Sequence, residues 1–163
     1  MDLDYRTFFE ELNHKEIDYL VVGGLAVNFH GVPRMTYDID LMIHLVVGNI
    51  NRLIALLNTW DYASRAPVQP EELADEQMRA LWIREKNMQA FSFYSDSQPL
   101  REIDVVIDSP IEYEELKGRA IVFDLKGVKV PVISIGDLIE IKRKVGRKQD
   151  LSDIERLQRV LEG

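Results

Sequence analysis

The chain has 163 residues, 46% of them hydrophobic and 29% charged, which is the ordinary composition of a globular domain with a proper core. Its net charge of −8 argues against general binding to nucleic acid, because proteins that neutralise many phosphates are normally basic. The absence of cysteine excludes disulfides, thiolate metal sites and cysteine nucleophiles.

The N-terminal segment predicts an amphipathic helix from about Asp4 to His14, with Phe8 and Leu12 on its apolar side. This segment is acidic where a signal peptide would be basic, and no apolar run approaches the length of a membrane span. We therefore expect a cytoplasmic location, no membrane association and a single domain over residues 1–163.

The next segment places two glycines directly after a strand and two aspartates on another strand. The short apolar run Tyr19–Val22 predicts a buried strand, and Gly23 and Gly24 lead from it into a helix-compatible stretch over residues 25–30. Residues 38–43 predict a second strand. In an extended chain Asp38 and Asp40 share one face, about 7 Å apart.

These two features together indicate a metal site beside a phosphate site. Mg²⁺ takes oxygen ligands and is commonly held by one or two carboxylates together with substrate phosphates. A diglycine turn before a helix lets backbone N–H groups approach a phosphate without a Cβ in the way. The alternative is structural: a tight strand-to-helix turn and two solvated aspartates. The glycines upstream favour the functional interpretation.

The middle of the chain predicts sheet and helix with little visible chemistry. Residues 48–60 have helical apolar spacing, with Asn49 as the expected N-cap, and a second helix is expected through Met78, Leu81 and Trp82. Trp60 and Trp82 are expected in the core, although either would also suit the wall of an acceptor pocket. Residues 88–94 alternate as a strand.

Residues 101–108 predict a further strand that carries a third acidic candidate. Asp104 interrupts an apolar run, and a carboxylate there is costly to bury unless it is paired or bound to a metal. Asp108, which precedes Ser-Pro, is the alternative and has the pattern of a strand-end residue. We favour Asp104 as the third carboxylate, although the sequence alone leaves the register of the strand open.

The last third predicts a hairpin and then two helices. Residues 121–123 and 128–132 are expected strands, joined by a turn at Gly127. Ser134 and Asp137 form the pattern of a capping box, and Gly146 ends the helix that begins there. A final helix is expected to open at Asp150 or Ser152, so that the chain from about residue 134 is helical.

The order of an apolar residue, Gly23-Gly24, a helix, and then Arg34-x-Thr36-x-Asp38-x-Asp40 resembles the nucleotidyltransferase fold of the polymerase-beta type. It is most similar to small members, the aminoglycoside-nucleotidyltransferase-like and abortive-infection-toxin-like proteins. The resemblance covers most of the chain. It implies the α/β (α+β) class: a minimal nucleotidyltransferase fold with a mixed, twisted sheet flanked by helices.

The resemblance also implies roles for particular residues. Asp38, Asp40 and Asp104 would bind Mg²⁺ or Mn²⁺, with Asp104 also acting as the base, and Gly23, Gly24, Arg34 and Thr36 would hold an NTP. Small relatives often carry a lysine on the penultimate helix and a K-D-x-x-D-like turn, which matches Lys142, Lys148, Asp150 and Asp153, with Gln149 as a departure. Lys142, and after it Lys148, would then offset triphosphate charge; solvated surface is the alternative.

The implied activity is transfer of a nucleoside monophosphate from an NTP to an acceptor, with release of pyrophosphate. The acceptor is open among a small molecule, a tRNA end and a protein, and nucleic acid is expected only in that role. The second hypothesis is a non-catalytic nucleotide- or partner-binding module, such as half of a toxin–antitoxin pair; a homodimer or an antitoxin-like partner is also open. A phosphohydrolase is disfavoured because the chain has no H-D or H-x-H metal pair.

Overall fold

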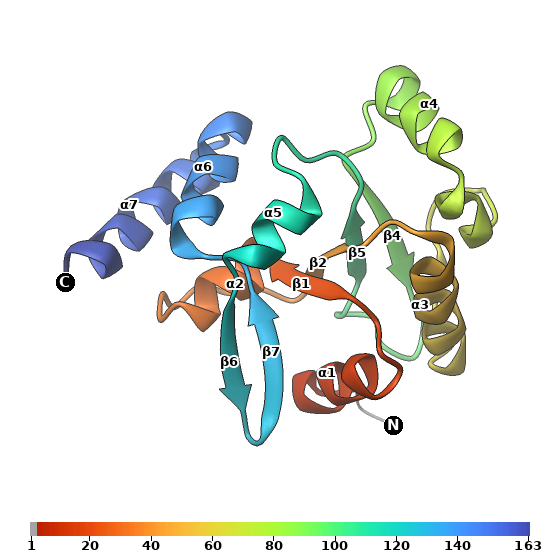
Figure 1. Ribbon diagram of the computed structural model, residues 1–163, viewed down its shortest axis with the longest axis horizontal. Coiled ribbons are helices and arrows are strands. Elements are labelled where there is room, and N and C mark those ends of the chain that lie inside the picture. Colours follow the sequence, from red (N-terminus) through yellow and green to blue (C-terminus); the bar gives the residue numbers. More distant parts are fainter. Residues whose placement is uncertain (1–2) are drawn as a thin grey trace.

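The computed structural model describes residues 3–163 and shows a mixed sheet with helices around it (Figure 1). The strands in these residues are β1 (Tyr19–Val22), β2 (Ile39–Ile43), β3 (Ala63–Ser64), β4 (Ala90–Tyr94), β5 (Ile103–Val106), β6 (Ile121–Leu125) and β7 (Val128–Val132). Their order across the sheet is β3-β4-β5-β2-β1-β7-β6. The predicted fold class, a mixed sheet flanked by helices, is confirmed.

The helices in the described part of the chain are α1 (Tyr5–His14), α2 (Gly23–Phe29), α3 (Val47–Thr59), the short 3₁₀ helix η1 (Pro70–Ala74), α4 (Glu76–Lys86), α5 (Tyr113–Gly118), α6 (Ile135–Val145) and α7 (Lys148–Glu162). Figure 1 shows α6 and α7 together at one side of the molecule and α3 and α4 at the other. Within residues 3–163, every helix is too short or too polar to cross a membrane.

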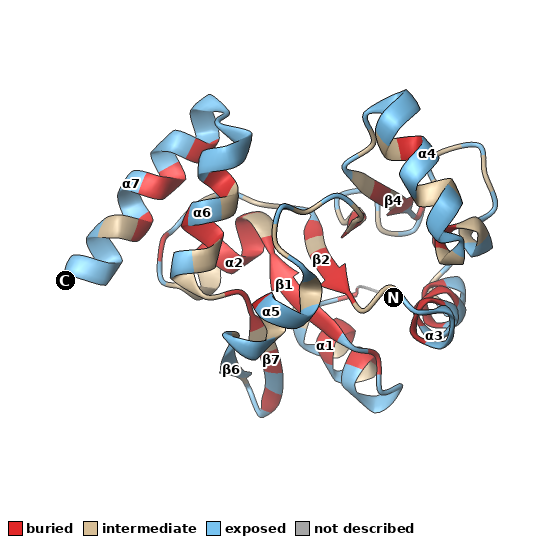
Figure 2. Ribbon diagram, turned by 45° about the horizontal axis from the view of Figure 1, so that its top comes forward, coloured by how far each residue is buried: buried red, intermediate tan, exposed pale blue. Residues whose placement is uncertain are grey.

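The centre of the sheet carries the acidic candidates because of its register. β1 runs antiparallel to β2, so that Val22 lies opposite Asp40, and β2 runs parallel to β5, so that Asp40 lies beside Asp104. All four residues of β1 are buried, as a central strand covered on both faces requires. Figure 2 shows this burial at β1 and α2, whereas α7 buries only one side.

Several elements begin where the sequence predicts, and others begin elsewhere. Helix α2 begins at Gly23 itself rather than at residue 25, and α7 begins at Lys148 rather than at Asp150 or Ser152. The earlier start of α7 arises because Asp150 acts from the third helical position, where its carboxylate accepts from the backbone N–H of the N-cap residue Arg147. Ser134 caps α6 and Gly146 ends it in the left-handed conformation, as expected.

Asn49 is not the N-cap of α3, because the helix already begins at Val47. The Asn49 side chain is instead buried, and it accepts from the backbone N–H of Asp18 at 2.8 Å. Its amide group donates to the carbonyls of Asp18 and His44, both at 2.9 Å. These bonds join the start of β1 to the end of β2, which holds the two central strands in register.

Replacing Asn49 with alanine would leave the backbone N–H of Asp18 without its acceptor. It would also remove one of the two donors from each of the carbonyls of Asp18 and His44, which would keep only the backbone N–H groups of His44 and Val46. An unpaired N–H in a partly buried position is costly. We expect Asn49→Ala to lower the free energy of unfolding by about 2–4 kcal/mol, measured by urea denaturation. Asn51→Ala, on an exposed position of the same helix, is the control and should change it by less than about 0.5 kcal/mol. Equal stability of the two variants would contradict this role for Asn49.

Candidate functional site

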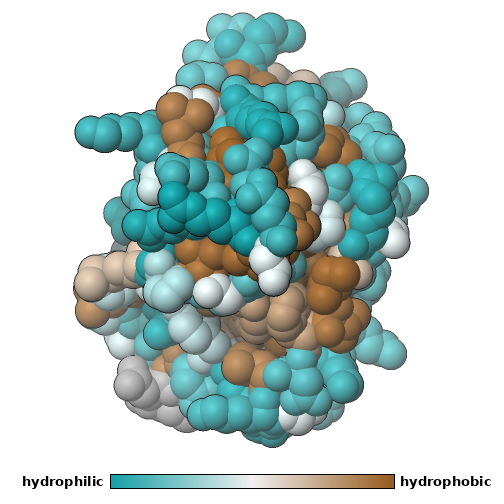
Figure 3. Space-filling model, turned by 90° about the vertical axis from the view of Figure 1, so that its left-hand side faces the viewer, coloured by the Kyte–Doolittle hydropathy of each residue, from teal (hydrophilic) through white to brown (hydrophobic). Residues whose placement is uncertain are grey.

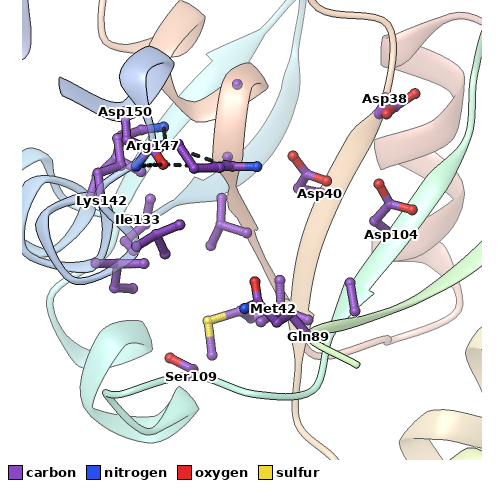
Figure 4. Close-up of a pocket in the computed structure, with 18 of the residues that line it drawn as sticks. Asp38, Asp40, Met42, Gln89, Asp104, Ser109, Ile133, Lys142, Arg147 and Asp150 are labelled. Atoms are coloured by element: carbon purple, nitrogen blue, oxygen red, sulfur yellow. Dashed lines mark hydrogen bonds and ion pairs between the residues drawn. The ribbon is translucent and has the colours of Figure 1, made fainter. Parts of the chain in front are cut away.

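A cleft of about 830 Å³ lies between the centre of the sheet and the C-terminal helices. Its wall on one side is formed by the N-terminus of α2 and by β2 and β5, and on the other side by α6 and the turn before α7. Figure 4 shows Asp38, Asp40 and Asp104 on the first side and Lys142, Arg147 and Asp150 on the second. The face that carries α6 and α7 is mainly hydrophilic, with separate hydrophobic patches (Figure 3). The cleft thus has an acidic side and a basic side.

Asp40 and Asp104 form the acidic centre of this cleft. They are neighbours across the parallel pair β2–β5, so their side chains project from the same face of the sheet. Burial, together with the charge of Asp104, raises the pKa of Asp40 to about 7. A backbone hydrogen bond from Gly24 acts in the opposite direction. Two carboxylates held this close favour a bound proton or a cation.

Asp38 lies just before β2 and is exposed, so it is outside the strand in which the sequence places it. Partial loss of hydration raises the pKa of Asp38 above its ordinary value, and the charges of Asp104 and Glu102 add to this shift. The charge of Asp104 therefore acts on both Asp38 and Asp40. Asp108 also lines the cleft, beyond the end of β5, but it has no place in the register beside Asp40.

The carboxylates suit a divalent cation in their chemistry. The Oδ1 atom of Asp104 is buried and has no hydrogen-bond partner, which is the state of an acceptor that a cation or a donor would complete. Within residues 3–163 no three acidic or histidine side chains form a ready-made metal cage. Mg²⁺ commonly needs only one or two carboxylates, because water and substrate phosphates supply its other ligands. The donor set therefore fits Mg²⁺ or Mn²⁺.

Gly23 is required by the close approach of Asp40. A Cβ built at Gly23 would lie 2.1 Å from Asp40 Oδ2, well inside van der Waals contact, and Gly23 has φ +65°, a conformation that favours glycine. The glycine thus lets the carboxylate lie against the backbone at the start of α2. Gly23 and Asp40, which are separate parts of the sequence motif, therefore pack directly against each other.

Gly24 has the same relation to Arg34 and Thr36. A Cβ there would lie 2.9 Å from Thr36 Oγ1 and 3.3 Å from Arg34 Cζ, so both side chains lie over the helix backbone at this point. All four residues line the cleft together with Asp40, and the predicted phosphate-binding residues Gly23, Gly24, Arg34 and Thr36 are brought together. Arg34 Nε is buried and has no partner.

The structure separates the two predicted lysines. Lys142 is buried in the cleft wall, where its Nζ lies 3.4 Å from Asp150 Oδ1 and 3.1 Å from Asp153 Oδ2. Lys148 is exposed at the start of α7 and is not part of the cleft lining. Nucleotide binding by either lysine stays a prediction.

Arg147 lines the cleft, although the sequence favours its neighbour Lys148 as the basic candidate in this turn. Its Nε donates to Asp150 Oδ2 at 2.8 Å, and its side chain is otherwise 74% exposed. Burial alone would raise the pKa of Asp150, but the hydrogen bond from Arg147 and the charge of Lys142 hold this pKa below its ordinary value. The spacing of Arg147 and Asp150 at the start of a helix was a usable signal, because it fits a capping pair.

No family model and no curated protein sequence matches the chain. Solved structures do match it in fold, at low sequence identity. The lincosamide antibiotic adenylyltransferase LnuA, solved with lincomycin bound, shares 14% identity at a TM-score of 0.62, over 94% of this chain and 93% of LnuA. ANT(2'')-Ia, solved with adenylyl-2''-tobramycin, shares 13% at a TM-score of 0.57, over 94% of this chain and 84% of that one.

A third similar structure is an antigenic nucleotidyltransferase-like protein from Paracoccidioides brasiliensis. It shares 18% identity at a TM-score of 0.54, over 93% of this chain and 72% of that chain. Identities this low establish the fold rather than the activity. The chain therefore has a nucleotidyltransferase fold, as its glycine and aspartate motifs predict.

The contact between Gly23 and Asp40 has a measurable consequence. We expect Gly23→Ala to lower the free energy of unfolding by about 2–4 kcal/mol, because the methyl group meets a carboxylate in a strained backbone conformation. Gly136→Ala in α6 is the matched control, since a Cβ there meets nothing within 4 Å. A Gly23→Ala protein as stable as the control in urea denaturation would show that the two residues do not pack as described.

The raised pKa of Asp40 predicts how stability depends on pH when no divalent cation is present. With a pKa of about 7 in the folded state against an ordinary 3.8, Asp40 binds its proton more tightly when folded. Its contribution is complete below about pH 4 and is lost as the pH rises through 7. In EDTA we expect the free energy of unfolding to fall by about 1–3 kcal/mol between pH 5 and 8.

Asp40→Asn should abolish most of this fall, because the amide does not titrate and removes the repulsion with Asp104. Urea denaturation of both proteins across this pH range is the measurement. An undiminished fall in Asp40→Asn would assign the titration to another group.

Proposed function

We propose that the protein is a nucleotidyltransferase that uses Mg²⁺ or Mn²⁺ and moves a nucleoside monophosphate from an NTP to an acceptor hydroxyl or phosphate, releasing pyrophosphate. The observation that carries the proposal is the pair Asp40 and Asp104, which lies beside the backbone of Gly23 and Gly24 in one cleft. A cation site and a phosphate site in contact are what an NTP with its metal needs. The fold shared with LnuA and ANT(2'')-Ia supports the same reaction class.

Each side of the cleft would have a separate task in this reaction. Asp40 and Asp104, joined by Asp38, would hold the divalent cation, which would supply positive charge to the phosphate oxygens. The backbone at Gly23 and Gly24, with Thr36 above it, would receive the triphosphate. Arg34 and Arg147 would balance its negative charge, with Lys148 as a further candidate for this task.

The chemical step is a displacement at the α-phosphorus. A bond forms between the acceptor oxygen and this phosphorus, and the bond from the phosphorus to the bridging oxygen of pyrophosphate breaks. The proton of the acceptor hydroxyl would pass to Asp104, whose Oδ1 is buried without a partner and is thus free to accept it. Asp40, the immediate neighbour, would stay with the cation.

Small hydroxyl compounds are the first acceptors to test. LnuA is named as a lincosamide antibiotic adenylyltransferase and was solved with lincomycin, and ANT(2'')-Ia was solved with adenylyl-2''-tobramycin; both ligands are small molecules. A tRNA end is less favoured by the net charge of −8, because RNA binding rewards a basic surface. A protein acceptor and an antitoxin-like partner are the remaining classes, and an NTP-using enzyme of this kind would work in the cytoplasm.

The proposed metal site predicts a specific pattern of binding. Isothermal titration of each NTP with Mg²⁺ into the wild type should show metal-dependent binding. Asp38→Ala/Asp40→Ala should weaken this binding at least about tenfold, because it removes two of the carboxylates that would hold the cation. NTP binding that does not depend on Mg²⁺ and is unchanged by the double substitution would overturn the proposed site. Binding that is intact without product would favour the non-catalytic module.

The choice of Asp104 over Asp108 predicts a difference in turnover. With bulk tRNA and a panel of small hydroxyl compounds as acceptors, we expect Asp104→Asn to lower pyrophosphate release at least about 100-fold, since it removes both a cation ligand and the base. Asp108→Asn should have a much smaller effect, because Asp108 lies beyond the end of β5 and has no place beside Asp40 in the register. The reverse order of effects would move the third carboxylate to Asp108.

A further inference from the structure

A network of charges, largely buried except for Arg147, joins the two C-terminal helices to the loop that precedes β2. Lys142 of α6 lies between Asp150 and Asp153 of α7, at 3.4 Å and 3.1 Å. Asp153 also accepts from Arg34 Nη1 at 2.5 Å, and Asp150 accepts from Arg147 Nε at 2.8 Å. The network therefore links three cations through two carboxylates, and both carboxylates are only 2% exposed.

A network of this kind is an expensive way to join two helices. Each buried charge loses its hydration, and well-packed apolar residues of similar volume would often stabilise the same contact as well or better. The rest of α6 and α7 shows that apolar packing is used here, through Leu138, Ile139, Ile154 and Leu157. The two buried aspartates are thus better explained by the side chains that they bind than by the stability of the helix contact.

Asp150 and Asp153 bind the two arginines that line the cleft, Arg147 and Arg34. Asp153 binds one end of the Arg34 guanidinium, and the centre of that guanidinium lies over the backbone of Gly24, at the start of α2. The Nε atom of Arg34 is buried and unpaired, so this group still has a donor to give. Asp150 holds Arg147 in the same manner at the other end of the network.

The charges of the network do not cancel. Lys142, Arg34 and Arg147 carry three positive charges, and Asp150 and Asp153 carry two negative ones, which leaves one net positive charge in the wall facing the acidic pair. Since Lys142 is occupied by both carboxylates, the surplus is available through the arginines. An anionic ligand with several oxygens would complete the balance.

We propose that Asp153 and Asp150 are positioning residues that fix Arg34 and Arg147 in the orientation that receives the triphosphate, and that Lys142 neutralises the two aspartates rather than touching phosphate. This inference rests on the proposed function, since it takes the ligand of the cleft to be a triphosphate. A long arginine side chain loses conformational freedom when it binds. A carboxylate that holds it beforehand removes that cost from the binding step.

A double-mutant cycle on Arg34 and Asp153 tests this coupling. The probe is inorganic tripolyphosphate with Mg²⁺, which carries no base, measured by isothermal titration, with the metal alone as the blank. In the wild-type background we expect Asp153→Asn to weaken binding about tenfold; in an Arg34→Met background, less than about twofold, because the group that Asp153 positions is gone.

Two further variants separate positioning from folding. Asp153→Asn leaves Lys142 and Arg34 short of a counter-charge, so Lys142→Met/Asp153→Asn, which removes one charge of each sign, is tested beside it and should weaken binding to the same extent. Asp137→Asn is the matched control. Asp137 of α6 also pairs with an arginine, with Arg119 Nε at 2.9 Å, but it does not line the cleft. It should leave the affinity unchanged.

The outcomes distinguish this inference from the function on which it rests. Equal losses from Asp153→Asn in both backgrounds would overturn the positioning role and leave the proposed transferase intact. Tripolyphosphate binding with the expected coupling, but no labelled product with any acceptor, would support the positioning role and count against transfer. A wild type that binds neither tripolyphosphate nor any NTP in the presence of Mg²⁺ would overturn both.

Discussion

The repulsion between two carboxylates on neighbouring strands is the constraint around which this structure is built. Asp40 and Asp104 are side by side because β2 and β5 are parallel and in register, and burial raises the pKa of Asp40 to about 7. A fold does not gain stability from such a pair. The arrangement is understandable if a cation is the missing partner, and the unpaired Asp104 Oδ1 points to the same conclusion.

The surroundings of the pair follow from this constraint. Asp40 can lie close to the start of α2 only because residue 23 has no side chain. In the same way, the side chains of Arg34 and Thr36 lie over the backbone of Gly24. The two glycines thus leave room for Asp40 on the acidic side of the cleft and for Arg34 on the basic side. The register itself depends on Asn49, whose buried amide joins the ends of β1 and β2.

The basic wall is arranged by a different principle, in which charges are held by other charges. Arg34 comes from the loop before β2 and Arg147 from the turn before α7, more than one hundred residues apart, and both are tied to carboxylates of α7. Helices α6 and α7 therefore do more than cover the sheet. They bring fixed positive charge to the side of the cleft that faces Asp40 and Asp104 (Figure 4).

The sequence by itself determined the class of fold and pointed to the residues at the centre of the candidate site. Apolar runs with period two, the position of Gly23-Gly24 and the spacing of Asp38 and Asp40 are local patterns, and local patterns are preserved when the chain folds. The structure brings Asp104 rather than Asp108 into register beside Asp40, and its role as the third carboxylate stays a prediction. The signal in the sequence was that an acidic residue inside an apolar strand has few structural reasons to be there.

The tertiary structure alone decided how distant charges pair. The sequence predicts that Lys142 is either exposed to solvent or bound to phosphate. It is instead buried between two aspartates, because α7 packs against α6. Arg147 rather than Lys148 lines the cleft because α7 begins at residue 148, and the start of a helix depends on a capping contact that spacing only partly reveals. Pairing in space depends on how the helices pack, and no periodicity in the chain records that.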